Sequence, residues 1–235
     1  MSTAATAPPC VPADRHAAQS RSHGHGAVAG GSGARAVWLL AGILLPLAAF
    51  AALATSTRTG PPTFDLILLE HARLAGGGRL DAAWLVITRL GYEWGVVPGD
   101  FLLVAVLLVL RRWRGALFAA VALGGSGLLN VAAKQLFSRV RPDLWIPIAP
   151  EHNFSFPSGH AMGSITLAWV LVLLAWRTRW RWPVAVTAAG FVAAVGWSRV
   201  HLGVHYPSDI LAGWTLATAW VMACRAGFFR GDRPA

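Results

Sequence analysis

The stretch SRVHLGVHYPSD, residues 198–209, lies between two long apolar segments. It holds Arg199, His205 and Asp209, together with a second histidine, within twelve residues. Pro207 suits the first turn of a helix, so the stretch is typical of a junction between two helices. Ionisable groups at a membrane are costly, and by default they indicate function.

The composition favours a protein embedded in a membrane. The 235-residue chain has a mean hydropathy of +0.53 and only 13% charged residues, whereas soluble domains carry about 25%. Its 12 tryptophans suit a protein that meets two membrane–water interfaces, where such rings collect. We therefore expect an integral membrane protein with one folded domain.

The net charge of +10 and the sequence pI of 11.4 would also suit a nucleic-acid-binding protein. The positions of the arginines argue against a nucleic-acid partner, because they come in threes between apolar segments, as in the cytoplasmic loops of multi-span proteins. These triplets are Arg111, Arg112 and Arg114; Arg177, Arg179 and Arg181; and Arg225, Arg230 and Arg233.

The apolar pattern predicts an all-α fold, a polytopic membrane helix bundle with six transmembrane helices and short interfacial helices. The predicted spans are approximately residues 36–54, 94–110, 115–137, 159–176, 183–197 and 210–224. Residues 64–90 are amphipathic with a break at Gly76–Gly78, which fits two short interfacial helices. A signal peptide is the rival interpretation of the first span, but its apolar part exceeds the usual length of about 7–15 residues.

The ends of the chain differ from this membrane domain, which we place at residues 35–226. Residues 1–34 lack periodicity and are rich in small and polar residues, so we expect a disordered polar tail. Its HGHG motif could bind a metal weakly, but a solvated segment explains it better. Residues 227–235 form a short basic tail. The arginine triplets place both termini in the cytoplasm, although four arginines in the outer segments oppose that assignment.

The ionisable residues, whose placement at membrane depth costs free energy, gather at the predicted outer ends of the helices. In KQLFSRVRP, residues 134–142, Lys134 and Arg141 are seven apart, so both lie on one face if the helix continues until Pro142 ends it. Two fixed cations suit an anion with several oxygens. The planar guanidinium of arginine can hydrogen-bond to two of those oxygens, whereas the lysine ammonium attracts the anion as a point charge. A lone lysine at a helix end could instead extend its amine toward the interface.

The segment PSGH, residues 157–160, adds a helix start. Ser158 is a good N-cap, and Gly159 lets the backbone approach a ligand closely. The free N–H groups and the positive end of the helix dipole would face an anion, with His160 in the first turn. Taken alone, this pattern is more often an ordinary helix start.

Within the opening stretch, His205 and Asp209 are four residues apart, so the carboxylate can accept a hydrogen bond from one imidazole nitrogen. That bond fixes the tautomer and leaves the other nitrogen free to attack. His201 precedes His205 by four residues, a spacing that metal ligands also show. No carboxylate or cysteine cluster completes a metal shell in the sequence, so we assign no metal and give His201 a structural or interfacial role.

The three segments together resemble the three-part signature of the type 2 phosphatidic acid phosphatase superfamily, in its membrane lipid phosphatase branch. That superfamily also includes the vanadium-dependent haloperoxidases and glucose-6-phosphatase. Each segment alone is weak evidence for the family, whereas all three segments, in order and on one predicted side of a membrane protein, are specific to it. The architecture resembles the family over approximately residues 36–225, and the motifs lie within residues 134–209.

The resemblance implies a role for each residue of the signature. His205 would attack phosphorus to form a phosphohistidine, and Asp209 would orient it. His160 would protonate the leaving group and then activate water. The groups that would hold the phosphoryl oxygens are Lys134, Arg141, Ser158, Gly159 and Arg199. The resemblance implies neither a metal nor another cofactor.

The expected function is that of a metal-independent lipid phosphatase whose site faces the periplasm, or outside, of a bacterial-type inner membrane. Its substrate would be a lipid phosphate such as undecaprenyl diphosphate, phosphatidate or phosphatidylglycerol phosphate. The alternatives are a lipid phosphotransferase, vanadate-dependent halide oxidation, and a non-catalytic protein that binds or transports lipid phosphates. The sequence leaves the headgroup and the oligomeric state open.

Overall fold

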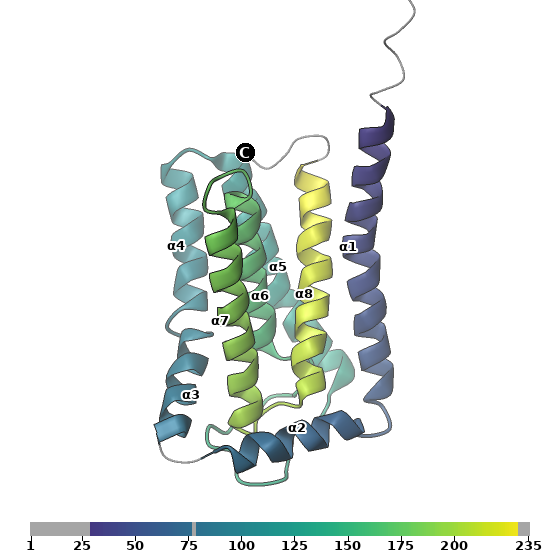
Figure 1. Ribbon diagram of the computed structural model, residues 1–235, viewed down its shortest axis with the longest axis vertical. Helices are drawn as coiled ribbons and strands as arrows, with labels where there is room; N and C mark the ends of the chain where they lie inside the picture. The colour runs from purple at the N-terminus through teal and green to yellow at the C-terminus, as the bar shows by residue number, and fades with distance from the viewer. Residues whose placement is uncertain (1–28, 77–78, 230–235) are drawn as a thin grey trace, which may run out of the picture. The chain divides into compact units, whose positions relative to one another are not determined.

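A computed structural model describes residues 29–76 and 79–229 of the chain. These residues form eight α-helices and contain no β-strand, so the prediction of an all-helical chain is confirmed (Figure 1). The helices are α1 (Ala29–Ser56), α2 (Thr63–Leu74), α3 (Arg79–Leu90), α4 (Val96–Val109), α5 (Trp113–Phe137), α6 (Gly159–Ala175), α7 (Arg181–His201) and α8 (Pro207–Phe228). The HGHG motif of the predicted tail lies outside the described residues.

The chain divides into two compact units, Met1–Val37 and Trp38–Ala235, and the second holds α2–α8 and most of α1. The helix α1 begins at Ala29, so residues 29–34 are helical although the predicted polar tail includes them.

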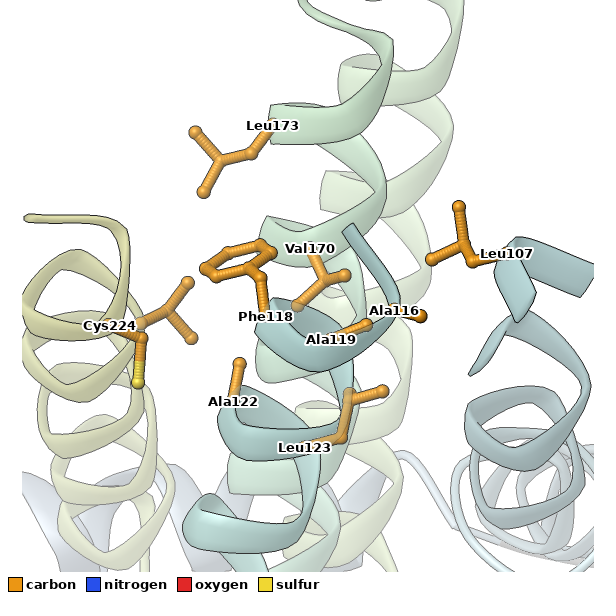
Figure 2. Close-up of a cluster of buried hydrophobic side chains, with 10 residues drawn as sticks. Leu107, Ala116, Phe118, Ala119, Ala122, Leu123, Val170, Leu173 and Cys224 are labelled. Atoms are coloured by element: carbon orange, nitrogen blue, oxygen red, sulfur yellow. The ribbon is translucent and has the colours of Figure 1, made fainter. Parts of the chain in front are cut away.

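Helix α6 has the most neighbours within the second unit, because it packs against α4, α5, α7 and α8. Figure 2 shows apolar side chains of α5, including Phe118 and Ala122, beside Val170 of α6 and Cys224 of α8. The approach of α6 to α8 depends on Gly213, where an added Cβ would lie 2.9 Å from the Ser158 carbonyl oxygen. This packing sets the start of α6 against the first turns of α8.

The short helices α2 and α3 occupy the segment predicted to be amphipathic. Helix α2 lies across the ends of α7 and α8 (Figure 1). The α7–α8 connection meets α2 at this end, and so does the loop between α5 and α6, through a contact of Arg139 with Asp65. The loops that carry the predicted site therefore converge at one end of the helices.

Two helices among the described residues, α5 and α7, are both long enough and apolar enough to cross a membrane. The shorter apolar helices are α4, α6 and the part of α1 from Leu40 to Ser56. Helix α7 extends to His201, four residues beyond the predicted span, so Arg199 lies in its last turn rather than in a loop. Helix α8 begins at Pro207, three residues before the predicted apolar span, which confirms that this proline lies in the first helical turn.

Candidate active site

His205 lies in the short connection between α7 and α8 and is fully buried. Gly203 turns the chain there with a φ of +74°, and an added Cβ would lie 2.6 Å from the Trp145 indole nitrogen. Both the left-handed backbone and the close contact require glycine at this position. Pro207 then begins α8, so His205 is held between two fixed helix ends.

The two ring nitrogens of His205 face different partners. The Arg141 guanidinium approaches Nε2 at 3.1 Å. Because arginine only donates, Nε2 must be the unprotonated acceptor and Nδ1 carries the proton. Nδ1 lies 3.4 Å from the Asp209 carboxylate and 3.3 Å from the Ser155 hydroxyl. Burial, followed by the nearby Arg141 and Arg199, holds the pKa of His205 well below its ordinary value of 6.5. The imidazole is therefore neutral at pH 7, and its Nε2 carries an unprotonated lone pair, which Arg141 contacts.

Asp209 is fully buried and held by four groups. Its Oδ2 accepts hydrogen bonds from the Tyr206 amide at 2.9 Å and from the Ser155 hydroxyl. This Oδ2 is also the oxygen nearest His205, while Oδ1 accepts from Arg139 at 2.5 Å. The bond to the Tyr206 amide is half of a capping box at the start of α8. The Asp209 carboxylate therefore both caps the start of α8 and orients the His205 imidazole.

Three cations converge beside the imidazole from separate elements: Lys134 of α5, Arg141 of the following loop and Arg199 of α7. Asn153 accepts from both Lys134, at 2.9 Å, and Arg141. Glu151 accepts from Arg141, at 2.6 Å, and from Arg199. Such a set of fixed donors is suited to an anion that carries several oxygens.

Glu151 is the one carboxylate of the described residues that pairs with two of these cations. Burial alone would raise the pKa of Glu151, but the neighbouring cations, Arg199 foremost, bring it below its usual range. The carboxylate is therefore ionised, and its two oxygens contact the two arginines in the manner of a bound oxyanion.

Arg199 is almost completely buried, with 2% of its surface exposed. One of its terminal nitrogens donates to the Thr88 hydroxyl of α3 at 2.6 Å. Its Nε is buried and has no hydrogen-bond partner among the described residues. A buried donor without a partner is costly, so this N–H is a group that an anion oxygen would satisfy.

The start of α6 supplies the remaining predicted residues. Ser158 caps the helix by accepting from the Ala161 amide at 3.5 Å, and its own amide donates to the Asp209 carbonyl at 3.1 Å. A Cβ on Gly159 would lie 3.1 Å from the Asn130 side-chain oxygen of α5. The His160 ring packs against Tyr92 at an interplanar angle of 33°, with ring centroids 4.9 Å apart.

The condition under which Lys134 and Arg141 would share one helix face is not met, because the helix does not continue to Pro142. Helix α5 ends at Phe137, because Ser138 adopts a left-handed conformation (φ 45°) and closes the end with a hydrogen bond to the Lys134 carbonyl. The chain then reverses, and the two cations meet through Asn153 instead.

His201 and His205 do not share partners. His201 Nε2 lies 2.8 Å from the Asp81 carboxylate of α3, and its ring faces Trp84. This pairing ties α3 to α7, in agreement with the structural role expected for His201.

Sequence reasoning missed several residues of the site. Arg139 lies inside KQLFSRVRP, two residues before Arg141, and this closeness could have identified it as a candidate. Glu151, Asn153 and Ser155 lie in the loop before PSGH, and nothing in their spacing separates them from ordinary loop residues. Asp65, which contacts Arg139, is 74 residues away in the chain.

Comparison with protein families gives a match to a model described as the PAP2 superfamily over residues 115–232. The chain is 35% identical over 135 residues to phosphatidylglycerophosphatase B of Bacillus subtilis, covering 55% of this chain and 66% of that protein. It is 29% identical over 149 residues to an undecaprenyl-diphosphatase of Sulfolobus acidocaldarius, covering 60% and 67%. The matched region thus spans about two thirds of the length of each of these relatives.

Solved structures show a similar arrangement of helices. A transmembrane PAP2 type phosphatidylglycerolphosphate phosphatase from Bacillus subtilis superimposes with a TM-score of 0.70 at 28% identity, covering 80% of this chain and 96% of that one. LpxE of Aquifex aeolicus superimposes with a TM-score of 0.58 at 22% identity, covering 69% and 95%, which indicates the shared fold alone.

Proposed function

Because the chain belongs to the PAP2 superfamily, in its branch of membrane lipid phosphatases, we propose that it hydrolyses a phosphomonoester or diphosphate lipid through a phosphohistidine on His205. The observation that supports this proposal most is the convergence of Lys134, Arg141 and Arg199 beside the unprotonated Nε2 of His205. Substrates of the undecaprenyl diphosphate, phosphatidate or phosphatidylglycerol phosphate type would fit a site built for a phosphoryl group.

In the first step, the Nε2 lone pair of His205 attacks phosphorus, and the bond from phosphorus to the leaving oxygen breaks. His160 transfers a proton to that oxygen. The imidazole then carries phosphate on Nε2 and a proton on Nδ1, so it is positively charged, and the Asp209 carboxylate stabilises it. The three cations stabilise negative charge on the phosphoryl oxygens, which is the main demand of phosphoryl transfer.

In the second step, water attacks the phosphohistidine while His160 accepts the proton of that water. The phosphorus–nitrogen bond breaks, inorganic phosphate leaves, and His205 returns to its neutral form. Ser158 and the Gly159 amide, at the positive end of the α6 dipole, would contact the same oxygens.

Glu151 has a defined place in this scheme. Its carboxylate contacts Arg141 and Arg199, the two arginines that the phosphoryl group needs. A bound phosphoryl group would take over these contacts, and Glu151 would move outward with its loop. Glu151 therefore competes with the substrate for the arginines.

For the membrane arrangement, we propose that α1, α4, α5, α6, α7 and α8 cross the bilayer while α2 and α3 lie at its outer surface. The described arginines at the helix ends opposite the candidate site, as expected for the cytoplasmic side, are Arg111, Arg112, Arg114, Arg177, Arg179, Arg181 and Arg225. Large apolar side chains such as Leu102, Leu128 and Val186 are exposed, which suits contact with lipid. The site would then face the periplasm, and both termini the cytoplasm.

The test is release of inorganic phosphate by purified protein from a panel of lipid mono- and diphosphates, with and without a chelator. We expect release that persists in chelator and is abolished by His205→Ala, with the variant still folded. Transfer of phosphate to a second lipid, without free phosphate, would identify a phosphotransferase instead. Loss of activity in chelator would contradict the metal-independent mechanism.

A further inference from the structure

We infer that Arg139 and Asp65 are positioning residues, which hold the Asp209 carboxylate, and through it the His205 imidazole, in the reactive orientation. Arg139 lies inside the first signature segment but was given no role there, and Asp65 lies outside all three segments. The inference rests on the proposed function, because the step it assists is the attack of His205 on phosphorus.

Arg139 bridges two buried carboxylates. Its Nη1 donates to Asp209 Oδ1 at 2.5 Å and to the Ser208 hydroxyl at 2.7 Å, and its Nη2 donates to Asp65 Oδ2 at 3.1 Å. The side chains of Asp65 and Asp209 are completely buried, and that of Arg139 is 11% exposed. The Tyr206 ring covers the guanidinium at 4.1 Å. Buried carboxylates need such a partner, and the planar fork of arginine fixes both at once.

Asp65 also closes the start of α8. Its Oδ1 accepts from the Ser208 amide at 2.7 Å, and its Oδ2 accepts from the Ser208 hydroxyl at 2.5 Å. The neighbouring Tyr206 amide donates to Asp209, and Pro207 has no amide hydrogen to satisfy. A carboxylate of α2 and a carboxylate of α8 itself therefore cap the helix that carries Asp209.

The two oxygens of Asp209 divide their contacts: Oδ2 lies nearest His205, and Oδ1 is held by Arg139. Arg139 thereby prevents the carboxylate from turning away from the imidazole. Asp65 has a second effect, on charge. In formal charges, the two carboxylates and the one guanidinium leave one net negative charge opposite the imidazolium that forms on attack. Without the charge of Asp65 the group is neutral, and it stabilises that imidazolium less.

The test compares Asp65→Asn, which keeps the shape and removes the charge, with Glu70→Gln, which removes an exposed charge on the same helix. Phosphate release from a lipid phosphate gives kcat, and inhibition by inorganic phosphate gives Ki. We expect kcat to fall about 10- to 100-fold in Asp65→Asn, by analogy with the loss of a group that orients a metal-binding histidine. The Ki should change less than about 3-fold, because the three cations that bind phosphate are intact. Glu70→Gln should match the wild type.

A purely structural role gives a different pattern. In an Asp209→Asn background, Asp65→Asn should add less than about 3-fold, since residues that act through one another are not additive. Loss of kcat and phosphate affinity together, a multiplicative loss in the Asp209→Asn background, or an unchanged kcat would each overturn the inference. If Asp65→Asn does not fold, Arg139→Lys replaces it, because lysine keeps the charge but cannot bridge both carboxylates; the same fall in kcat is expected.

The proposed function and this inference can fail separately. Wild-type protein that releases no phosphate from any lipid phosphate contradicts the function before any variant is compared. The positioning is then measured without turnover, from the Nδ1–H proton resonance of His205 in protein labelled with ¹⁵N-histidine. That resonance should shift in Asp65→Asn and stay in place in Glu70→Gln; identical spectra would overturn the inference.

Discussion

Replacing Glu151 by glutamine should tighten the binding of inorganic phosphate. The carboxylate of Glu151 contacts Arg141 at 2.6 Å and also contacts Arg199, so a phosphate ion must displace it from both. Glutamine keeps nearly the same size and can still hydrogen-bond, but it loses the charge that holds the arginines. The competition for the two guanidinium groups therefore weakens.

The size of the effect follows from the two contacts. Because the arginines stay charged, Glu151→Gln removes only the ion-pair part of each contact, about 1 kcal/mol, the upper end of the range for partly exposed pairs. Two contacts give about 2 kcal/mol. Because the Glu151 side chain is 25% exposed, solvent screening reduces this value. A remaining effect of about 1.4 kcal/mol corresponds to a tenfold lower Ki for phosphate.

The assay is competitive inhibition of lipid phosphate hydrolysis by inorganic phosphate, measured for wild type, Glu151→Gln and Glu70→Gln. We expect about a tenfold lower Ki in Glu151→Gln and no change in Glu70→Gln, which alters an exposed residue of α2. A Ki that is unchanged or higher in Glu151→Gln would refute the reasoning. It would mean that the carboxylate organises the arginines for phosphate rather than competing with it.

Three further predictions concern the cations, the imidazole and the helix packing. Arg199→Gln should lower kcat about 10²- to 10³-fold, the usual effect of losing one donor to a developing charge, and initial rates of phosphate release that match the wild type would contradict its role. Because the pKa of His205 lies well below 6.5, the neutral nucleophile persists as the pH falls through 6.5, and the acid limb of kcat/KM lies below that value. Arg141→Gln removes a cation that lowers this pKa, so the limb should move to higher pH on the same substrate; a limb that stays in place or moves to lower pH contradicts the assignment. Gly213→Ala places a Cβ 2.9 Å from the Ser158 carbonyl oxygen and should destabilise the protein by about 1–3 kcal/mol. The control is Gly227→Ala on the same helix, where the added Cβ meets open space. Equal melting temperatures of the two variants would argue against the close approach of α6 to α8.

The sequence was sufficient to predict the helical class and the segments that meet at the site. Apolar runs of helical length are local signals, and so are the proline and serine that begin α8 and cap α6. The capping aspartate four residues after His205 could be placed for the same reason, since one helical turn fixes its reach.

The parts that the sequence did not predict depend on contacts between distant segments. The spacing of Lys134 and Arg141 would place both on one face of a helix that continued to Pro142, but the left-handed Ser138 ends α5 first. Only the folded loop brings Asn153 between the two cations. Nothing in the sequence distinguishes Asp65 from the other acidic residues of the chain. Its contact with Arg139 requires α2 to lie across the start of α8, which no local pattern specifies.

The most direct test of the central claim is to identify the residue that carries phosphate during turnover. Protein is mixed with a lipid substrate labelled with ³²P in the phosphoryl group, quenched in alkali, and digested for mapping of the label. A phosphoenzyme that is stable in alkali, labile in acid, located on His205 and missing from His205→Ala is the predicted result. Label on another residue, or full turnover by His205→Ala, would contradict the account.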